Sequence, residues 1–175
     1  YMVNLLPSYW SGFSGDFTFS DYLRQYCETV LSKVEGEKYL SVDSYPIMAD
    51  ESLGETFLLD LIMVKKYSLE YGATSHMCLQ SSSWIEGGNA LKSRTPTEAE
   101  MRLQVYTALA FGMDTYSMFT YAPLAGSDSD TDTWKRQESS AVSSTNQKNE
   151  CYDALAKVNG EALAIDHVYR CFNDW

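Results

Sequence analysis

The chain has 175 residues, of which 45% are hydrophobic and 21% are charged, as in an ordinary globular protein. Its 24 acidic and 13 basic residues give a net charge of -11, which argues against binding to nucleic acid or to an anionic lipid surface. No apolar run approaches the roughly 18 residues that a membrane-spanning helix needs. We therefore expect one globular domain over residues 1–175, with neither nucleic acid nor a membrane as a partner.

Four short strand-like runs recur along the chain, and an amphipathic stretch separates each from the next. The expected strands lie near residues 2–6, 39–43, 75–80 and 114–120. Their starts are 36 to 39 residues apart. A strand, loop and helix repeated at this spacing predicts consecutive βαβ units with right-handed crossovers and a parallel sheet.

The intervening helices carry start signals. Thr18 or Ser20 can cap the first helix, and Thr97 with Glu100 forms a T-x-x-E capping box at the start of the third. The second helix is expected where a mostly apolar run begins at Phe57. Each of these helices therefore has a plausible beginning in the sequence.

Stop signals follow the same segments. Gly36, Gly72 and Gly112 each come after an amphipathic stretch and before a strand-like run, which is typical of a left-handed helix cap. A last helix is expected over 149–172 with a break or kink at Gly160, because glycine inside a helix costs about 1 kcal/mol relative to alanine.

The connections between strands and helices differ in length. Links from helix to strand span two to five residues, whereas the links from strand to helix are long. The long links cover residues 8–18, 46–54, 81–96 and 122–148. In a parallel α/β fold these loops leave the carboxyl edge of the sheet, where active sites lie. We therefore expect the functional site at that edge.

Polar and apolar residues alternate in strand-like runs such as YLSVD and YSMFT. This alternation favours a barrel over a doubly wound sheet, whose strands are almost continuously apolar. A complete barrel needs about 250 residues and rarely has fewer than 200. We therefore expect the last four βα units of a (β/α)8 TIM barrel, with the N-terminal half of the same barrel as a partner. A free-standing open α/β domain that binds a small molecule is the alternative fold.

Several stretches are similar to a known family. VNLLPSY, LSVDSYP, MCLQSS and RTPTEAEMRLQVYTALAFGMDTYSMFTYAP resemble the second half of a (β/α)8 glycoside hydrolase. The closest likeness is to β-galactosidase-like barrels around glycoside hydrolase family 42 and to related bacterial glycosidase-like proteins. The resemblance implies that the strands here are the fifth to eighth of the barrel. It also implies a carbohydrate substrate and hydrolysis of O-glycosidic bonds.

The same resemblance assigns the two catalytic carboxyl groups. The general acid is expected on the fourth strand, in the N-terminal half, and the nucleophile at the end of the seventh strand, where this chain has Gln80. An amide neither titrates nor attacks an anomeric carbon. Either another carboxylate acts in its place, or the protein binds a sugar without cleaving it. Gln80 is then a ligand contact or a structural residue.

Asp43 is the internal candidate for catalysis. Tyr39, Ser41 and Asp43 share one face by the two-residue period of a strand, so Asp43 is expected to point into the barrel mouth. There it can bond a sugar hydroxyl, orient a water or act as general base. The alternative is that it bonds the backbone of the following turn. In that turn, we hypothesise a cis Tyr45–Pro46 bond.

Further substrate contacts are expected from polar and aromatic side chains. Asn4 lies inside an apolar strand, where it either faces the substrate or bonds a neighbouring strand. Aromatic residues in the loops offer flat faces to sugar rings or serve in packing. These are Tyr9, Trp10, Tyr45, Trp84 and Tyr121. We select Tyr45 and Trp84 foremost, and Tyr121 as a third ligand contact.

No metal or cofactor is expected. Asp128, Asp130 and Asp132 have calcium-like spacing, but Thr133 stands where an EF-hand needs glycine. No nucleotide-binding glycine motif follows any strand, and the four cysteines are widely spaced. Glu86 is expected to be a solvated loop residue, and His76 an interior strand residue.

Overall fold

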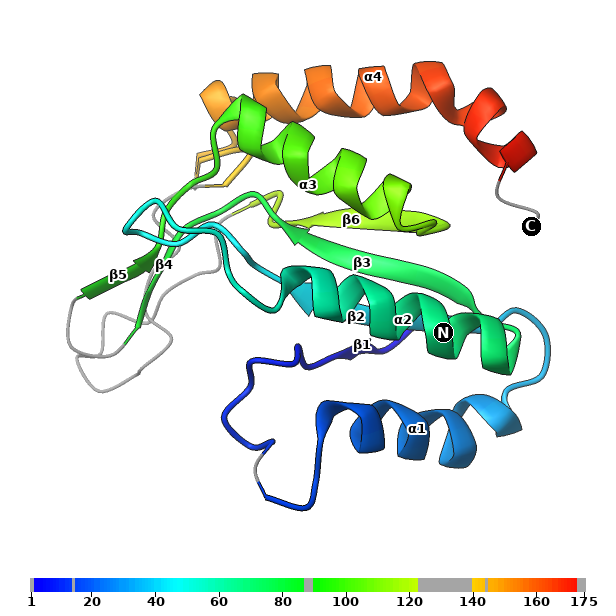
Figure 1. Ribbon diagram of the computed structural model, residues 1–175. Coiled ribbons are helices and arrows are strands. Elements are labelled where there is room, and N and C mark those ends of the chain that lie inside the picture. Colours follow the sequence, from blue (N-terminus) through cyan, green and yellow to red (C-terminus); the bar gives the residue numbers. More distant parts are fainter. Residues whose placement is uncertain (1, 14, 87–89, 123–139, 144, 173–175) are drawn as a thin grey trace. The chain divides into compact units, whose positions relative to one another are not determined.

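A computed structural model describes residues 2–13, 15–86, 90–122, 140–143 and 145–172 (Figure 1). Within these ranges the chain forms a four-stranded parallel sheet, four α-helices and a two-stranded antiparallel hairpin. The strand order in the sheet is β1-β2-β3-β6, so each strand lies beside the one that precedes it along this sheet. The expected α/β fold with a parallel sheet is confirmed.

The four sheet strands lie close to their predicted positions. They are β1 (Asn4–Leu5), β2 (Tyr39–Ser44), β3 (Thr74–Gln80) and β6 (Thr115–Phe119). In the parallel pair of β1 and β2, Asn4 is opposite Ser41 and Leu5 is opposite Val42. The long link predicted over 81–96 additionally contains the hairpin of β4 (Trp84–Glu86) and β5 (Ala90–Ser93), which the sequence analysis missed.

The chain divides into two compact units. The first comprises Tyr1–Ser44, Glu55–Cys78 and Thr107–Ser117. The second comprises Tyr45–Gly54, Leu79–Tyr106 and Met118–Trp175. The first unit holds most of the parallel sheet and the loop after β1, whereas the second holds the hairpin and the segments that follow β2, β3 and β6.

The core of the first unit is built by two helices on the sheet. Helix α2 (Phe57–Tyr71) packs against β2, and helix α1 (Phe19–Thr29) packs against α2. The side chains that fill this core are aliphatic, aromatic or thiol groups. They are Leu23, Cys27, Leu40, Val42, Phe57, Leu61, Val64 and Met77. Burial of this apolar surface, rather than helix propensity, holds the helices in place.

The predicted helix boundaries are mostly right in this unit. Thr18 caps α1 in a reciprocal capping box with Asp21, and Gly72 ends α2 in the left-handed conformation with φ 61°. Gly36, also left-handed, does not end α1. The α-helix stops earlier and tightens into a 3-10 turn over Leu31–Lys33, which places Leu31 in the core.

The second unit contains the last helix. Helix α4 (Glu150–Phe172) is continuous, so the expected break at Gly160 is wrong. Cys151, Leu155, Val158 and Ala162 are buried at helical spacing along one side. This stripe anchors the helix on both sides of the glycine, and its packing outweighs the weak propensity of a single residue.

Helix α3 (Glu98–Ala110) begins at the predicted capping box, since Thr97 and Glu100 bond each other reciprocally. Arg102 on α3 forms an ion pair of 2.7 Å with Glu161 on α4. Charged residues also recur along α4. Among the described residues no helix is both long and apolar enough to cross a membrane.

Gly160→Ala should raise the free energy of unfolding by about 0.5 to 1 kcal/mol, because a β-carbon there contacts nothing within 4 Å and helix propensity improves. Gly72→Ala is the matched control. It should destabilise the chain, because the left-handed φ of 61° strains any residue with a β-carbon. Denaturant unfolding of both variants measures the difference, and a destabilised Gly160→Ala variant would contradict the prediction.

Candidate functional site

One face of the sheet in the first unit is lined by polar side chains. We call it the polar face; its members are Asn4, Ser41, Asp43, His76, Thr115 and Ser117. Ser41 donates a hydrogen bond of 2.7 Å to the Asn4 side chain across β1 and β2. His76 bonds Thr115 and Ser117 across β3 and β6 at 2.9 and 3.0 Å. These bonds connect neighbouring strands through side chains as well as through the backbone ladder.

The opposite face carries the apolar residues of the same strands. Leu40 and Val42 are fully buried, and the next residue of that face, Ser44, bonds Asp60 of α2. Because successive side chains alternate between the faces, Asp43 lies on the same face as Ser41. The two-residue period therefore separates the side of β2 that packs on α2 from the polar face.

Asp43 is half-buried and precedes the last residue of β2. It thus lies toward the carboxyl end of its strand, the end at which parallel α/β proteins bind ligands. Asn4 is exposed on the neighbouring strand, and its side-chain oxygen accepts the Ser41 bond. Asn4 therefore fulfils the strand-bonding role, and a role for Asp43 and Asn4 in ligand contact stays a prediction.

His76 contacts one hydroxyl through each ring nitrogen. Nδ1 lies 2.9 Å from the Thr115 oxygen and Nε2 lies 3.0 Å from the Ser117 oxygen. The Thr115 hydroxyl also bonds the Ser75 carbonyl at 3.3 Å. Burial lowers the pKa of His76. The imidazole bridges β3 and β6, and its buried place inside a strand is the one predicted from the sequence.

Asp60 joins three segments at the carboxyl edge of the first unit. Its buried carboxylate accepts the Ser8 backbone N–H at 2.9 Å and the Ser44 hydroxyl at 2.7 Å. Burial raises the pKa of Asp60, while the bonds from Ser8 and Ser44 oppose that rise. The two hydrogen bonds to Asp60 fix the loop after β1 to the end of β2. Sequence analysis missed this residue, although an aspartate inside the apolar run FLLDLIM was a usable signal.

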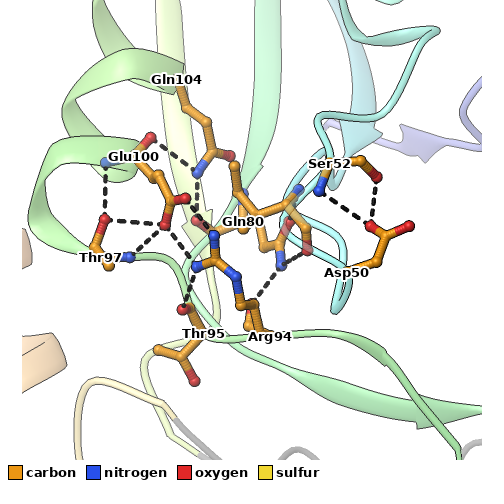
Figure 2. A network of polar contacts seen from close by, with 9 residues as sticks. Asp50, Ser52, Gln80, Arg94, Thr95, Thr97, Glu100 and Gln104 are labelled. Atoms are coloured by element: carbon orange, nitrogen blue, oxygen red, sulfur yellow. Dashed lines mark hydrogen bonds and ion pairs between the residues drawn. The ribbon is translucent and has the colours of Figure 1, made fainter.

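In the second unit, Gln80 is the centre of a buried network (Figure 2). Its side-chain oxygen accepts the Ile47 N–H at 2.7 Å, and its amide nitrogen donates to the carbonyls of Ile47, Ser82 and Arg94. The side chain thereby holds the loop over 45–54 and the segment after β3. This geometry favours the structural alternative for Gln80.

The backbone of Gln80 is paired in the same way. Its N–H donates to the side-chain oxygen of Gln104 at 2.9 Å, and its carbonyl accepts from the Gln104 amide at 3.1 Å. Gln104 lies on α3 and is fully buried. Each glutamine side chain therefore acts as a substitute for a neighbouring strand, at the point where the sheet ladder ends.

Arg94 and Glu100 extend this network at its more exposed side (Figure 2). The guanidinium of Arg94 bonds both carboxylate oxygens of Glu100, one of them at 2.7 Å. The pKa of Glu100 is lowered to about 2, mainly by the bond from Arg94 and in part by the bonds from Thr97. This ion pair connects the end of the hairpin to the start of α3.

The aromatic residues predicted to contact a ligand lie in different surroundings. The Tyr45 ring contacts the Phe119 ring at 5.6 Å between centroids, and Tyr121 is 64% exposed. The Tyr45–Pro46 bond is not cis; among the described residues the cis bond lies between Phe119 and Thr120. The side chain of Trp84, that of Glu86 and the three loop aspartates lie outside what is described. Within the described ranges no cluster of three metal-ligating side chains occurs.

Comparison with known proteins gives no family assignment. Protein-family models and curated protein sequences both return no match to this chain.

Gln80→Glu should destabilise the protein by about 3 kcal/mol or more at pH 7, because three carbonyl oxygens would then face a buried carboxylate without a donor. Those acceptors and burial raise the pKa of the introduced carboxyl. The loss should therefore be small in acid and grow as pH rises through that raised pKa. Unfolding at several pH values, with exposed Gln147→Glu as control, measures it. Equal stability of both variants at pH 7 would refute the network.

Glu100→Gln should lower stability by about 1 to 2 kcal/mol at pH 7, because the bond with Arg94 is lost. The lowered pKa means that this stabilisation is present above about 4.5 and disappears as pH falls toward 2. The wild-type and variant unfolding curves should converge in that window. Glu70→Gln, at an exposed position of α2, is the control and should not show this convergence.

Proposed function

We propose that the chain forms the last four βα units of a (β/α)8 barrel and that its polar face lines a site for carbohydrate hydrolysis. The strand order β1-β2-β3-β6 supports the barrel, because in a barrel each strand lies beside its predecessor. A doubly wound sheet instead reverses direction at a switch point. The polar face on a sequentially ordered parallel sheet is the observation that carries the proposal.

The chemistry of the polar face suits a neutral, hydroxyl-rich ligand. Apart from Asp43 its members are uncharged hydroxyl, amide and imidazole groups, which donate and accept hydrogen bonds as sugar hydroxyls do. Parallel sheets are usually apolar on both faces. A face that exposes Asn4 and Ser117 beside a half-buried carboxylate fits a hydrated cleft better than a packed layer.

Asp43 acts in this proposal as the base that orients and deprotonates the attacking water. The general acid belongs to the N-terminal half of the barrel, from which a second carboxyl group faces Asp43 across the glycosidic bond. A separation of about 6.5–9.5 Å between the two carboxyl groups leaves room for that water and inverts the anomeric centre. No cofactor takes part in these steps.

Asp43→Asn should reduce the turnover of aryl glycosides by roughly 100-fold or more, since an amide does not accept the proton of water. The measurement is release of 4-nitrophenol from 4-nitrophenyl β-D-galactopyranoside and related glycosides by the full-length protein. Asp153→Asn, exposed on α4, is the control and should be unchanged. Undiminished turnover in Asp43→Asn would remove Asp43 from the catalytic role.

A non-catalytic carbohydrate-binding barrel is the second candidate. The amide of Gln80 stands where the family resemblance expects the nucleophile, and its polar atoms are engaged by Ile47, Ser82 and Arg94. Calorimetry that detects sugar binding by a protein without turnover would favour this candidate. Absence of both binding and turnover would favour an open α/β domain with another small-molecule ligand.

A further inference from the structure

We propose that Trp10, in the loop after β1, is an aromatic platform that stacks against a sugar ring of an oligosaccharide. The inference rests on the proposed carbohydrate function and adds a subsite to it. Trp10 was among the aromatic residues predicted to stack on a sugar or to serve in packing, but Tyr45 and Trp84 were preferred to it. Three observations lead to it: the way the indole is held, the way its loop is anchored, and the chemistry that it presents.

The indole of Trp10 is held in place although it is 45% exposed. A β-carbon on Gly12 would lie 1.9 Å from Cζ3 of the ring, so the ring rests directly on the glycine backbone. Phe13 meets the indole edge to face, with 5.2 Å between ring centroids and 77° between ring planes. A ring that is fixed before binding loses little conformational freedom when a ligand stacks on it.

Phe13 also connects the platform to the core. Its ring contacts Tyr22 at 5.1 Å and Phe19 at 5.7 Å, and the Phe19 side chain is buried at the start of α1. Backbone bonds from Trp10 to Pro7 and from Phe13 to Trp10, at 3.0 and 3.1 Å, keep the loop turned. The exposed indole therefore has a rigid support beneath it.

Asp60 places this loop at the edge of the sheet where Asp43 lies. Ser8, two residues before Trp10, and Ser44, next to Asp43, are bonded to the same buried carboxylate. The loop thus leaves β1 beside the carboxyl end of β2. The Ser44 side chain points to the helix side of β2 and Asp43 to the polar face, so the loop and Asp43 share the strand end and not a face. A ligand that extends from Asp43 past the strand end toward this loop is therefore a chain of sugars and not a single sugar.

The exposed surface of the loop is aromatic with polar tips. Tyr9 is 43% exposed beside Trp10, and the two offer a hydroxyl and an indole N–H next to flat rings. A pyranose ring has an apolar C–H face and a rim of hydroxyl groups, which matches that combination. The net charge of -11 argues against a nucleic acid as the stacking partner.

The test is binding of cellohexaose and β-1,4-linked galactohexaose to the full-length protein, followed by calorimetry and by tryptophan fluorescence. Trp10→Ala should weaken binding of whichever hexaose the wild type takes by roughly tenfold. Trp10→Phe should retain most of the affinity and lose the part of the fluorescence change that comes from Trp10. Gly12→Ala, which displaces the ring by its β-carbon, should weaken binding as Trp10→Ala does.

Leu69→Ala is the matched control, because Leu69 is an apolar side chain, 67% exposed, at the opposite end of α2 from Asp60. It should bind the hexaose as the wild type does. If the wild type binds a hexaose and Trp10→Ala binds it equally well, the platform is refuted while the carbohydrate function survives. If the wild type binds no sugar, both proposals fail. If the wild type self-associates in sedimentation and Trp10→Ala does not, the indole serves an interface between copies, and the platform is refuted.

Discussion

The alternation of side chains along parallel strands is the constraint on which this structure depends. In β2 it directs Leu40, Val42 and Ser44 toward α2 and leaves Ser41 and Asp43 on the polar face. A shift of one residue in the register would place a carboxylate among Phe57, Leu61 and Val64. The cost of burying that charge makes the register, and therefore the position of the polar face, strongly specified.

At the carboxyl edge the sheet ends, and the loops need another source of hydrogen bonds. Two buried side chains supply it. Asp60 holds the backbone after β1 and the end of β2, and Gln80 holds the segments around Ile47 and Arg94. Both groups are satisfied by several partners, so burial of their polar atoms is offset. Such fixed loops are a suitable support for a ligand site, because their order is established before the ligand arrives.

The sequence predicted those parts of the fold that depend on local chemistry. Strands with alternating polarity, the capping box at Thr97 and the glycine after α2 are all correct, since each is determined within a few residues. The continuous helix across Gly160 was not predicted, because its stability depends on the burial of Val158 and Ala162. That burial involves residues distant in sequence, which a local pattern does not reveal. The hairpin over Trp84–Glu86 and Ala90–Ser93 was missed because both strands are short, although the sequence Gly87-Gly88-Asn89 between them was a usable hairpin signal.

In the candidate site, too, features set by local sequence were predictable and features set by long-range contacts were not. The face on which Asp43 lies follows from the two-residue period, whereas the partners of Gln80 come from residues 33 positions before it and 24 after it in the sequence. A side chain at a strand end can anchor a loop or react with a ligand, and the amide of Gln80 has two hydrogens for three carbonyl acceptors. Both hydrogens of this amide are engaged, which favours the structural alternative for Gln80, and its contact with a ligand stays a prediction. The end of β2 is anchored differently, because the hydroxyl of Ser44, next to Asp43, bonds the buried carboxylate of Asp60 on α2. At β3 the side chain on the polar face anchors the loops, whereas at β2 the anchoring side chain is on the helix side.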